Sequence, residues 1–108
     1  MTSETLPLCP DTRVEPDEAR LTEPVEVGPF GQGVVFVKVG ELDGAAVKAD
    51  LGISPSGYED WDAHWTSFET ACFEDAGMHA VRISNFGNWL RLRGDGEATV
   101  LAWFVGED

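Results

Sequence analysis

The sequence predicts an all-β fold, an antiparallel β-sandwich or jelly roll that carries an extended N-terminal arm. Short runs of alternating apolar and polar residues recur at intervals of about ten residues, the spacing of strands in such folds. Turn residues separate these runs, and all 12 glycines and every aromatic residue lie in the segment that contains them. A chain of 108 residues is long enough for one domain with one hydrophobic core.

The composition divides the chain into an arm, residues 1–27, and a sandwich domain, residues 28–108. Four of the 6 prolines lie in the arm, which has no glycine and no aromatic residue. Proline fixes φ and disfavours the helical conformation in the residue before it, so the arm is expected to be extended or irregular. Because it has few apolar residues to bury, we expect it to be mobile, or ordered only where it lies on another surface.

The first two strands of the domain are expected over residues 34–39 and 47–53. Residues 34–39 are rich in β-branched side chains, and the Asp43-Gly44 turn signal follows them. Residues 47–53 alternate apolar and polar side chains, which is the pattern of a half-buried strand.

The segment 58–73 permits two interpretations. Large apolar residues recur there at three- and four-residue steps, which would suit a helix. Threonine, phenylalanine and tryptophan dominate the segment, however, and no good capping residue precedes it. We therefore expect two short strands, over residues 64–68 and 70–73.

Three further strands complete the domain, and the first two of them alternate clearly. They are expected over residues 79–83, 89–93 and 98–105. The dipeptide Asp95-Gly96 predicts a hairpin between the last two strands. The final strand differs from the others because it is apolar on both faces.

The strong acidity argues against several classes of partner. The chain has 20 acidic residues against 7 lysines and arginines, and its formal charge is −13. Nucleic acids and anionic membranes are bound by clustered cations, so neither is expected as the main partner. No apolar run approaches the roughly 20 residues of a membrane span. The first residues also lack the basic and apolar regions of a signal peptide, so none is expected.

The sequence offers no catalytic constellation, and the protein is expected not to be an enzyme. Catalysis needs an activated nucleophile, a tuned acid–base pair or a metal. His64 and His79 lie in different expected strands, and His79 shares a face with two apolar residues, which favours a packed structural histidine. Cys72 is expected to be a small buried side chain, whereas Cys9 lies in the arm. Two cysteines are too few for a disulfide framework, and no cofactor is expected.

One acidic segment has the spacing of a candidate metal site. Asp60, Asp62 and His64 occupy alternate positions, so their side chains would point to one side, and carboxylate oxygens suit calcium. The bidentate glutamate and the turn glycine of an EF-hand loop are missing, and acidic residues are scattered along the whole chain. A solvated loop is therefore favoured, and no metal site is expected.

The outward sides of the last two strands are too apolar for a simple sandwich, whose solvated faces should be polar. If Leu90, Leu92 and Phe104 face the core, the residues between them face outward. Contiguous exposed apolar surface normally marks an association site, and tryptophan and arginine are enriched at binding hot spots. The expected interaction surface consists of Trp89, Arg91, Arg93, Leu101, Trp103 and Val105.

Two arrangements would bury this surface. The arm would bury it by folding back within one chain. Self-association would bury it between copies, and the two arginines would then pair with acids on a neighbouring subunit. We favour self-association.

Part of the sequence resembles small β-sandwich proteins of tailed-phage particles. The resemblance rests on the strand and turn that lead to Asn88-Trp89-Leu90-Arg91-Leu92-Arg93, within residues 77–93, and on an upstream loop at residues 56–61. Capsid decoration and accessory head proteins of this kind bind an assembled shell, often as trimers. The resemblance therefore implies a non-enzymatic structural protein that forms homotrimers and binds the exterior of a phage capsid. It would be located on the virion, or otherwise in the cytoplasm.

Two other functions fit parts of the sequence. A carbohydrate-binding module would stack sugar rings on exposed aromatic side chains and use nearby acids as hydrogen-bond acceptors. Its platform would consist of Tyr58, Trp61, Trp65, Asp60 and Asp62. An acidic inhibitor that mimics nucleic acid would fit the charge alone, provided that the acids gather on one surface.

Overall fold

The computed structural model describes residues 3–15, 20–22, 24–43, 46–55, 65–84 and 86–107. These residues form nine strands and no helix. A helix able to cross a membrane is accordingly absent from this part of the chain. The strands are β1 (Ser3–Val14), β2 (Arg20–Leu21), β3 (Val25–Glu26), β4 (Gln32–Gly40), β5 (Val47–Ser54), β6 (Thr66–Phe73), β7 (Gly77–Ser84), β8 (Trp89–Gly96) and β9 (Ala98–Glu107).

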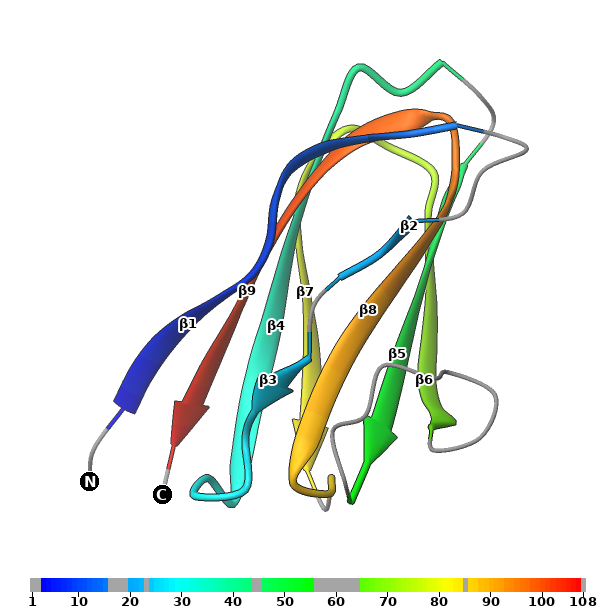
Figure 1. Ribbon diagram of the computed structural model, residues 1–108. Helices are drawn as coiled ribbons and strands as arrows, with labels where there is room; N and C mark the ends of the chain where they lie inside the picture. Colours follow the sequence, from blue (N-terminus) through cyan, green and yellow to red (C-terminus); the bar gives the residue numbers. More distant parts are fainter. Residues whose placement is uncertain are drawn as a thin grey trace.

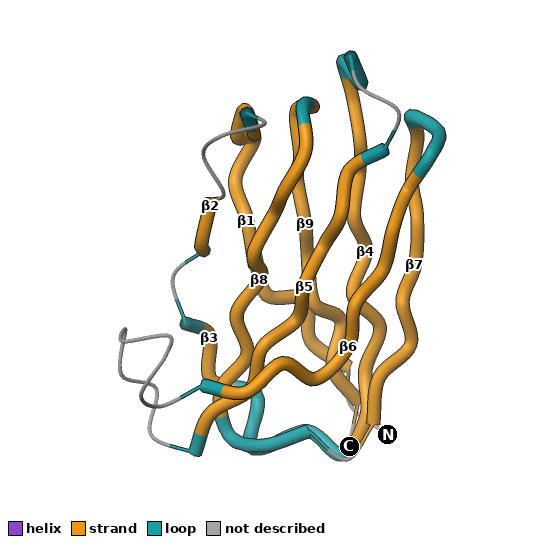
Figure 2. The backbone as a smooth tube through the Cα atoms, turned by 90° about the vertical axis from the view of Figure 1, so that its right-hand side faces the viewer, coloured by secondary structure: helices purple, strands orange, loops and turns teal. Residues whose placement is uncertain are grey.

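The strands form two sheets (Figures 1 and 2). Sheet 1 has the order β1-β9-β4-β7, and sheet 2 has the order β2-β8-β5-β6, with the short β3 also paired to β8. All of these strand pairs are antiparallel. The prediction of an antiparallel β-sandwich is therefore confirmed.

The core lies between the two sheets and follows the alternation of the sequence. On β9, every second residue from Ala98 to Gly106 is buried, and the residues between them are half-buried. Phe104 is fully buried, and the rings of Phe30 and Phe86 meet its ring edge-on, with centroids at 5.8 and 5.6 Å. The core side chains of neighbouring strands include Val35, Val37, Val39, Leu90 and Leu92.

Two short connections carry the chain from one sheet to the other. β7 follows β6, and β9 follows β8, across the sandwich instead of beside it. Gly77 and Gly96 have φ angles of 128° and 135° at these connections, a conformation that side chains other than glycine rarely adopt. The predicted hairpin at Asp95-Gly96 is therefore wrong, because the strands on either side of this dipeptide belong to different sheets.

The segment before Phe73 forms one strand. Residues 66–73 make up β6, so the helical alternative is wrong for the described part of the segment, and residues 58–64 lie outside it. The pairing of β6 with β5 shifts in register between Leu51 and Gly52. Such a bulge adds a residue to one strand, which interrupts the alternation and gives the sequence its ambiguous period.

Described residues of the expected arm are built into both sheets. β1 runs along β9 and forms an edge of sheet 1, while β2 and β3 pair with β8 at an edge of sheet 2. Pro7 and Pro10 lie in β1, where the pairing is irregular between Pro7 and Thr12. An edge strand tolerates proline because one side of it has no ladder to complete. Pro7 and Pro10, two of the four prolines that suggested a separate arm, therefore mark an edge strand.

Thr22 attaches the leading segment to β8 between the two short strands. Its backbone N–H donates to the carbonyl of Leu92 at 2.9 Å. Its hydroxyl accepts a hydrogen bond from the N–H of Leu92, also at 2.9 Å, and its carbonyl accepts one from Nε of Arg91. One threonine thus completes the ladder of β8 where neither short strand reaches it.

Replacing Thr22 by valine is expected to lower the free energy of unfolding by about 1–2 kcal/mol, since the N–H of Leu92 loses its acceptor while the side chain keeps its shape. Urea denaturation measures the change. The matched control is Thr66→Val on the exposed side of β6, for which we expect a change within about 0.5 kcal/mol. Equal effects at the two positions would contradict the role given to the Thr22 hydroxyl.

Candidate protein-interaction surface

The outer face of sheet 2 is charged along β5 and the later part of β8, whereas Trp89 and Arg91 at the start of β8 are half-buried and buried, respectively. Lys48 on β5 stands opposite Asp95 on β8, and Asp50 stands opposite Arg93. The Asp50 carboxylate also accepts hydrogen bonds from hydroxyl groups on β6. Opposite charges on neighbouring strands stabilise this face in contact with water.

The outer face of sheet 1 is apolar. Across the sheet, Trp103 on β9 stands between Pro7 on β1 and Phe36 on β4, and Val105 stands opposite Val34. Most of these side chains are half-buried because they pack on one another, while Met78 on β7 is 55% exposed. We define the apolar outer face by Val34, Phe36, Met78, Ala80, Leu101, Trp103 and Val105.

The leading segment borders this face without covering it. β1 pairs with the edge of β9 from Ser3↔Glu107 to Val14↔Ala98, so its described residues lie in the plane of sheet 1 (Figure 1). Residues 3–14 therefore do not fold over this surface, in contrast to the alternative in which the arm covers it. The apolar outer face is left open to a partner by the described part of the chain.

The structure divides the expected interaction surface between the two sheets. Leu101, Trp103 and Val105 face outward on β9, as the alternation predicted. Trp89 and Arg93 belong to β8 in the other sheet, so the six residues do not form one surface. The error has the same cause as the false hairpin, since two consecutive strands were expected to be neighbours. Whether either group binds a partner stays a prediction.

Arg91 is buried, contrary to expectation. It is 6% exposed, and its guanidinium carbon lies 5.4 Å from the ring centroid of Trp65. Its Nε donates to the carbonyl of Thr22. The segments that bury Arg91 lie some 25 and 70 residues away in the sequence, so the local pattern of β8 could not reveal them.

Trp65 is unsuited to stacking on a sugar as it stands, because it is only 8% exposed and contacts Arg91. The other members of the expected platform, Tyr58, Asp60, Trp61 and Asp62, lie outside the described residues, as does His64 of the candidate metal segment. Among the described residues no group of three potential metal ligands occurs.

Cys72, which was expected to be buried, is exposed, and Cys9 of the expected arm is buried. Cys72 faces solvent because its neighbour Phe73 takes the core side of β6. Desolvation raises the pKa of the Cys9 thiol above its ordinary value of 9.0, so it is protonated at neutral pH. His79 is half-buried and stacks on Phe73 at 4.4 Å, in agreement with a structural histidine.

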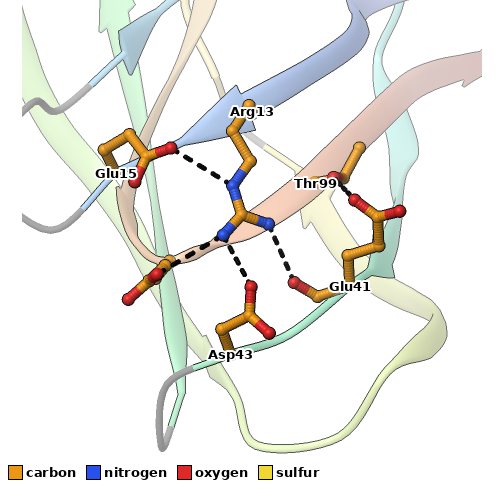
Figure 3. Close-up of polar contacts among 6 residues, drawn as sticks. Arg13, Glu15, Glu41, Asp43 and Thr99 are labelled. Atoms are coloured by element: carbon orange, nitrogen blue, oxygen red, sulfur yellow. Dashed lines mark hydrogen bonds and ion pairs between the residues drawn. The ribbon is translucent and has the colours of Figure 1, made fainter.

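Arg13 forms ion pairs with acidic residues from three parts of the chain at one end of the sandwich (Figure 3). Its guanidinium lies 2.7 Å from Asp43, 3.3 Å from Glu15 and 3.5 Å from Glu97. It also donates to the carbonyl of Glu41. The hydrogen bond to Asp43 raises the pKa of Arg13 above its ordinary value, so the side chain is always charged. This cluster connects the end of β1 to two interstrand connections and is a structural contact.

Two hollows border sheet 1. A cleft of about 600 Å³ lies between β1 and the strands of sheet 2, and its lining includes Cys9, Thr22 and Leu92. A second hollow of about 350 Å³ lies on the outer side, where Lys38, Leu101 and other residues form its walls. Neither combines a nucleophile with a base.

The comparisons with known proteins agree with the fold. No family model matches the sequence, and no curated protein matches it significantly. One similar solved structure is described as "Bacillus endospore appendages form a novel family of disulfide-linked pili"; it has a TM-score of 0.55 and 14% identity, over 96% of this chain and 84% of that chain. Another, "Crystal structure of PirA", has a TM-score of 0.44 and 13% identity, over 98% and 93% of the two chains. At these identities the first likeness concerns the fold alone, and the second is too weak to support an argument.

Proposed function

We propose that this protein is a non-enzymatic structural subunit that associates with further copies of itself in a larger assembly. The observation that carries the proposal is the contrast between the two outer faces. Sheet 2 presents opposite charges to solvent, whereas sheet 1 presents two large aromatic rings and several aliphatic side chains. Burying apolar surface is favourable at roughly 25 cal/mol per Å², so such a face stabilises whatever contact covers it.

The nature of the face suits a protein partner. Tryptophan, phenylalanine and methionine are enriched at the centres of protein interfaces, where charged residues are depleted. Trp103, Phe36 and Met78 supply all three on one sheet face. The net charge of −13 keeps free copies soluble until a specific contact forms.

The sequence resemblance adds a specific version of the proposal, in which the assembly is a trimer bound to the exterior of a phage capsid. The protein would then be located on the virion. A ligand that binds only the assembled shell stabilises the shell by its own binding free energy. The solved structure of 14% identity, whose description names pili, adds a second example of an ordered protein assembly as the setting of this fold.

Light scattering coupled to size-exclusion chromatography tests the general proposal, and a mass of two or more chains is expected. A single-chain mass at every concentration up to the millimolar range would overturn it. The capsid version predicts, in addition, co-sedimentation with empty phage shells and a rise in their melting temperature. Unchanged shells would reject that version while leaving self-association intact.

A further inference from the structure

We infer that the apolar outer face of sheet 1 pairs with the same face of a second copy, about a two-fold axis that runs along the strands between β9 and β4. The inference rests on the proposed function, because it specifies the contact through which the copies associate. A two-fold contact requires a surface that is complementary to itself. The arrangement of charge and shape on this face meets that requirement.

The charges of the face are separated into two halves. Lys38 on β4 and Arg82 on β7 are both exposed and lie on one side of the apolar centre. Asp11 on β1 and Glu107 on β9 lie on the other side. Glu41, just after β4, also reaches toward β9, where its carboxylate accepts a hydrogen bond from Thr99 at 3.2 Å. The β4–β7 half is thus cationic, and the β1–β9 half is anionic apart from Arg13 on β1, whose charge is balanced by its contacts with Glu15, Asp43 and Glu97.

An axis along the strands exchanges these halves. It sets β4 and β7 of one copy over β9 and β1 of the other, so that cations face acids on both sides of the centre. An in-plane axis across the strands would instead place each strand over its own counterpart, with cations over cations. Two chains that each carry −13 need such local complementarity to approach, and only the first axis supplies it.

The shape of the face supports the same axis. Met78, Lys38 and Leu101 occupy one row across sheet 1. The axis keeps each row at its own level, so it brings Met78 of one copy to the level of the partner copy's outer hollow. The walls of this hollow are Asp11, Lys38, Gly40, Glu41, Thr99 and Leu101. Met78 is the exposed large apolar side chain of the described residues, and this hollow gives it a place to be buried. Trp103 and Phe36 would form the shared apolar centre.

Charge reversal with exchange tests the pairing. The variant K38E/R82E places acids over acids, and the variant D11K/E107K places cations over cations, so each alone should dissociate at least about tenfold more readily than the wild type. A mixture of the two variants has opposite charges in both contacts and should regain wild-type association. The matched control, K48E/R93E, reverses a lysine and an arginine on the polar face of sheet 2 and should associate like the wild type. Circular dichroism confirms that each variant is folded.

The outcomes separate the two proposals. An even number of wild-type copies, weakened association in each charge variant and recovery in the mixture would support the pairing. A wild-type oligomer that the two face variants leave intact, that contains three copies, or that the K48E/R93E control dissociates would overturn the pairing but not the proposed function. A wild type that remains a single chain would overturn the proposed function, and some other occupant would then cover the face.

Discussion

Replacing Phe104 by alanine is expected to lower the free energy of unfolding by about 4 kcal/mol. The side chain is fully buried in the middle of sheet 1, and two further phenylalanine rings, Phe30 and Phe86, pack edge-on against it. The substitution removes the whole ring and leaves a cavity that strands held by continuous ladders cannot close. Both the lost burial and the empty volume add to the cost.

Urea denaturation of the wild type and the variant measures this change. The control is Phe36→Ala, which removes the same side chain from the half-buried outer face of the same sheet. At concentrations low enough to keep the copies separate, we expect it to cost less than half as much, because part of that ring is in contact with water in an isolated copy. Equal losses at the two positions would show that Phe104 is not the centre of the core.

Replacing Gly106 by alanine is expected to lower the free energy of unfolding by about 2–3 kcal/mol, although it adds only one methyl group. A Cβ at this position would lie 2.5 Å from the ring of Phe30 and 2.7 Å from that of Phe104. Phe104 is fully buried and Phe30, although partly exposed, packs edge-on against it, so neither ring can move away without disturbing the other. Gly33, the cross-strand partner of Gly106, is restricted by the same Phe104 ring.

Thermal and urea unfolding measure the loss of stability expected for Gly106→Ala, and Gly40→Ala is the control. Nothing lies within 4 Å of the Cβ that alanine would place at Gly40, so this variant should be as stable as the wild type or slightly more stable. A second test combines Gly106→Ala with Phe104→Leu. The smaller side chain makes room for the methyl group, so the double variant should lose less stability than the sum of the single changes. Additive losses would contradict the proposed clash.

The sequence predicted the strands well because alternation is a local property. The expected strands at residues 34–39, 47–53 and 79–83 lie within β4, β5 and β7, and the two C-terminal ones lie within β8 and β9. Residues 47–53, 79–83 and 89–93 show the period of two that burial on one side imposes, whereas β-branched and apolar composition indicated the other two strands. The outward orientation of Leu101, Trp103 and Val105 followed from the same rule.

The assignment of strands to sheets could not be derived in this way. An Asp-Gly dipeptide fits a hairpin turn, but at Gly96 the positive φ serves a crossing between layers, and the dipeptide does not distinguish the two. The expected burial of Cys72 was wrong for a related reason, because a shift of one residue along β6 moves a side chain from the core to the solvent. The burial of Arg91 depends on Thr22 and Trp65, which are remote in the sequence.

The pairing of β1 with β9 also determines when this protein is able to fold. Ser3 lies opposite Glu107, and β9 occupies an interior position between β1 and β4. β1 therefore has no partner in sheet 1 until β9 has been synthesised, although β4 and β7 can pair earlier. Slow folding, which is typical of folds with many contacts between distant residues, follows from this arrangement.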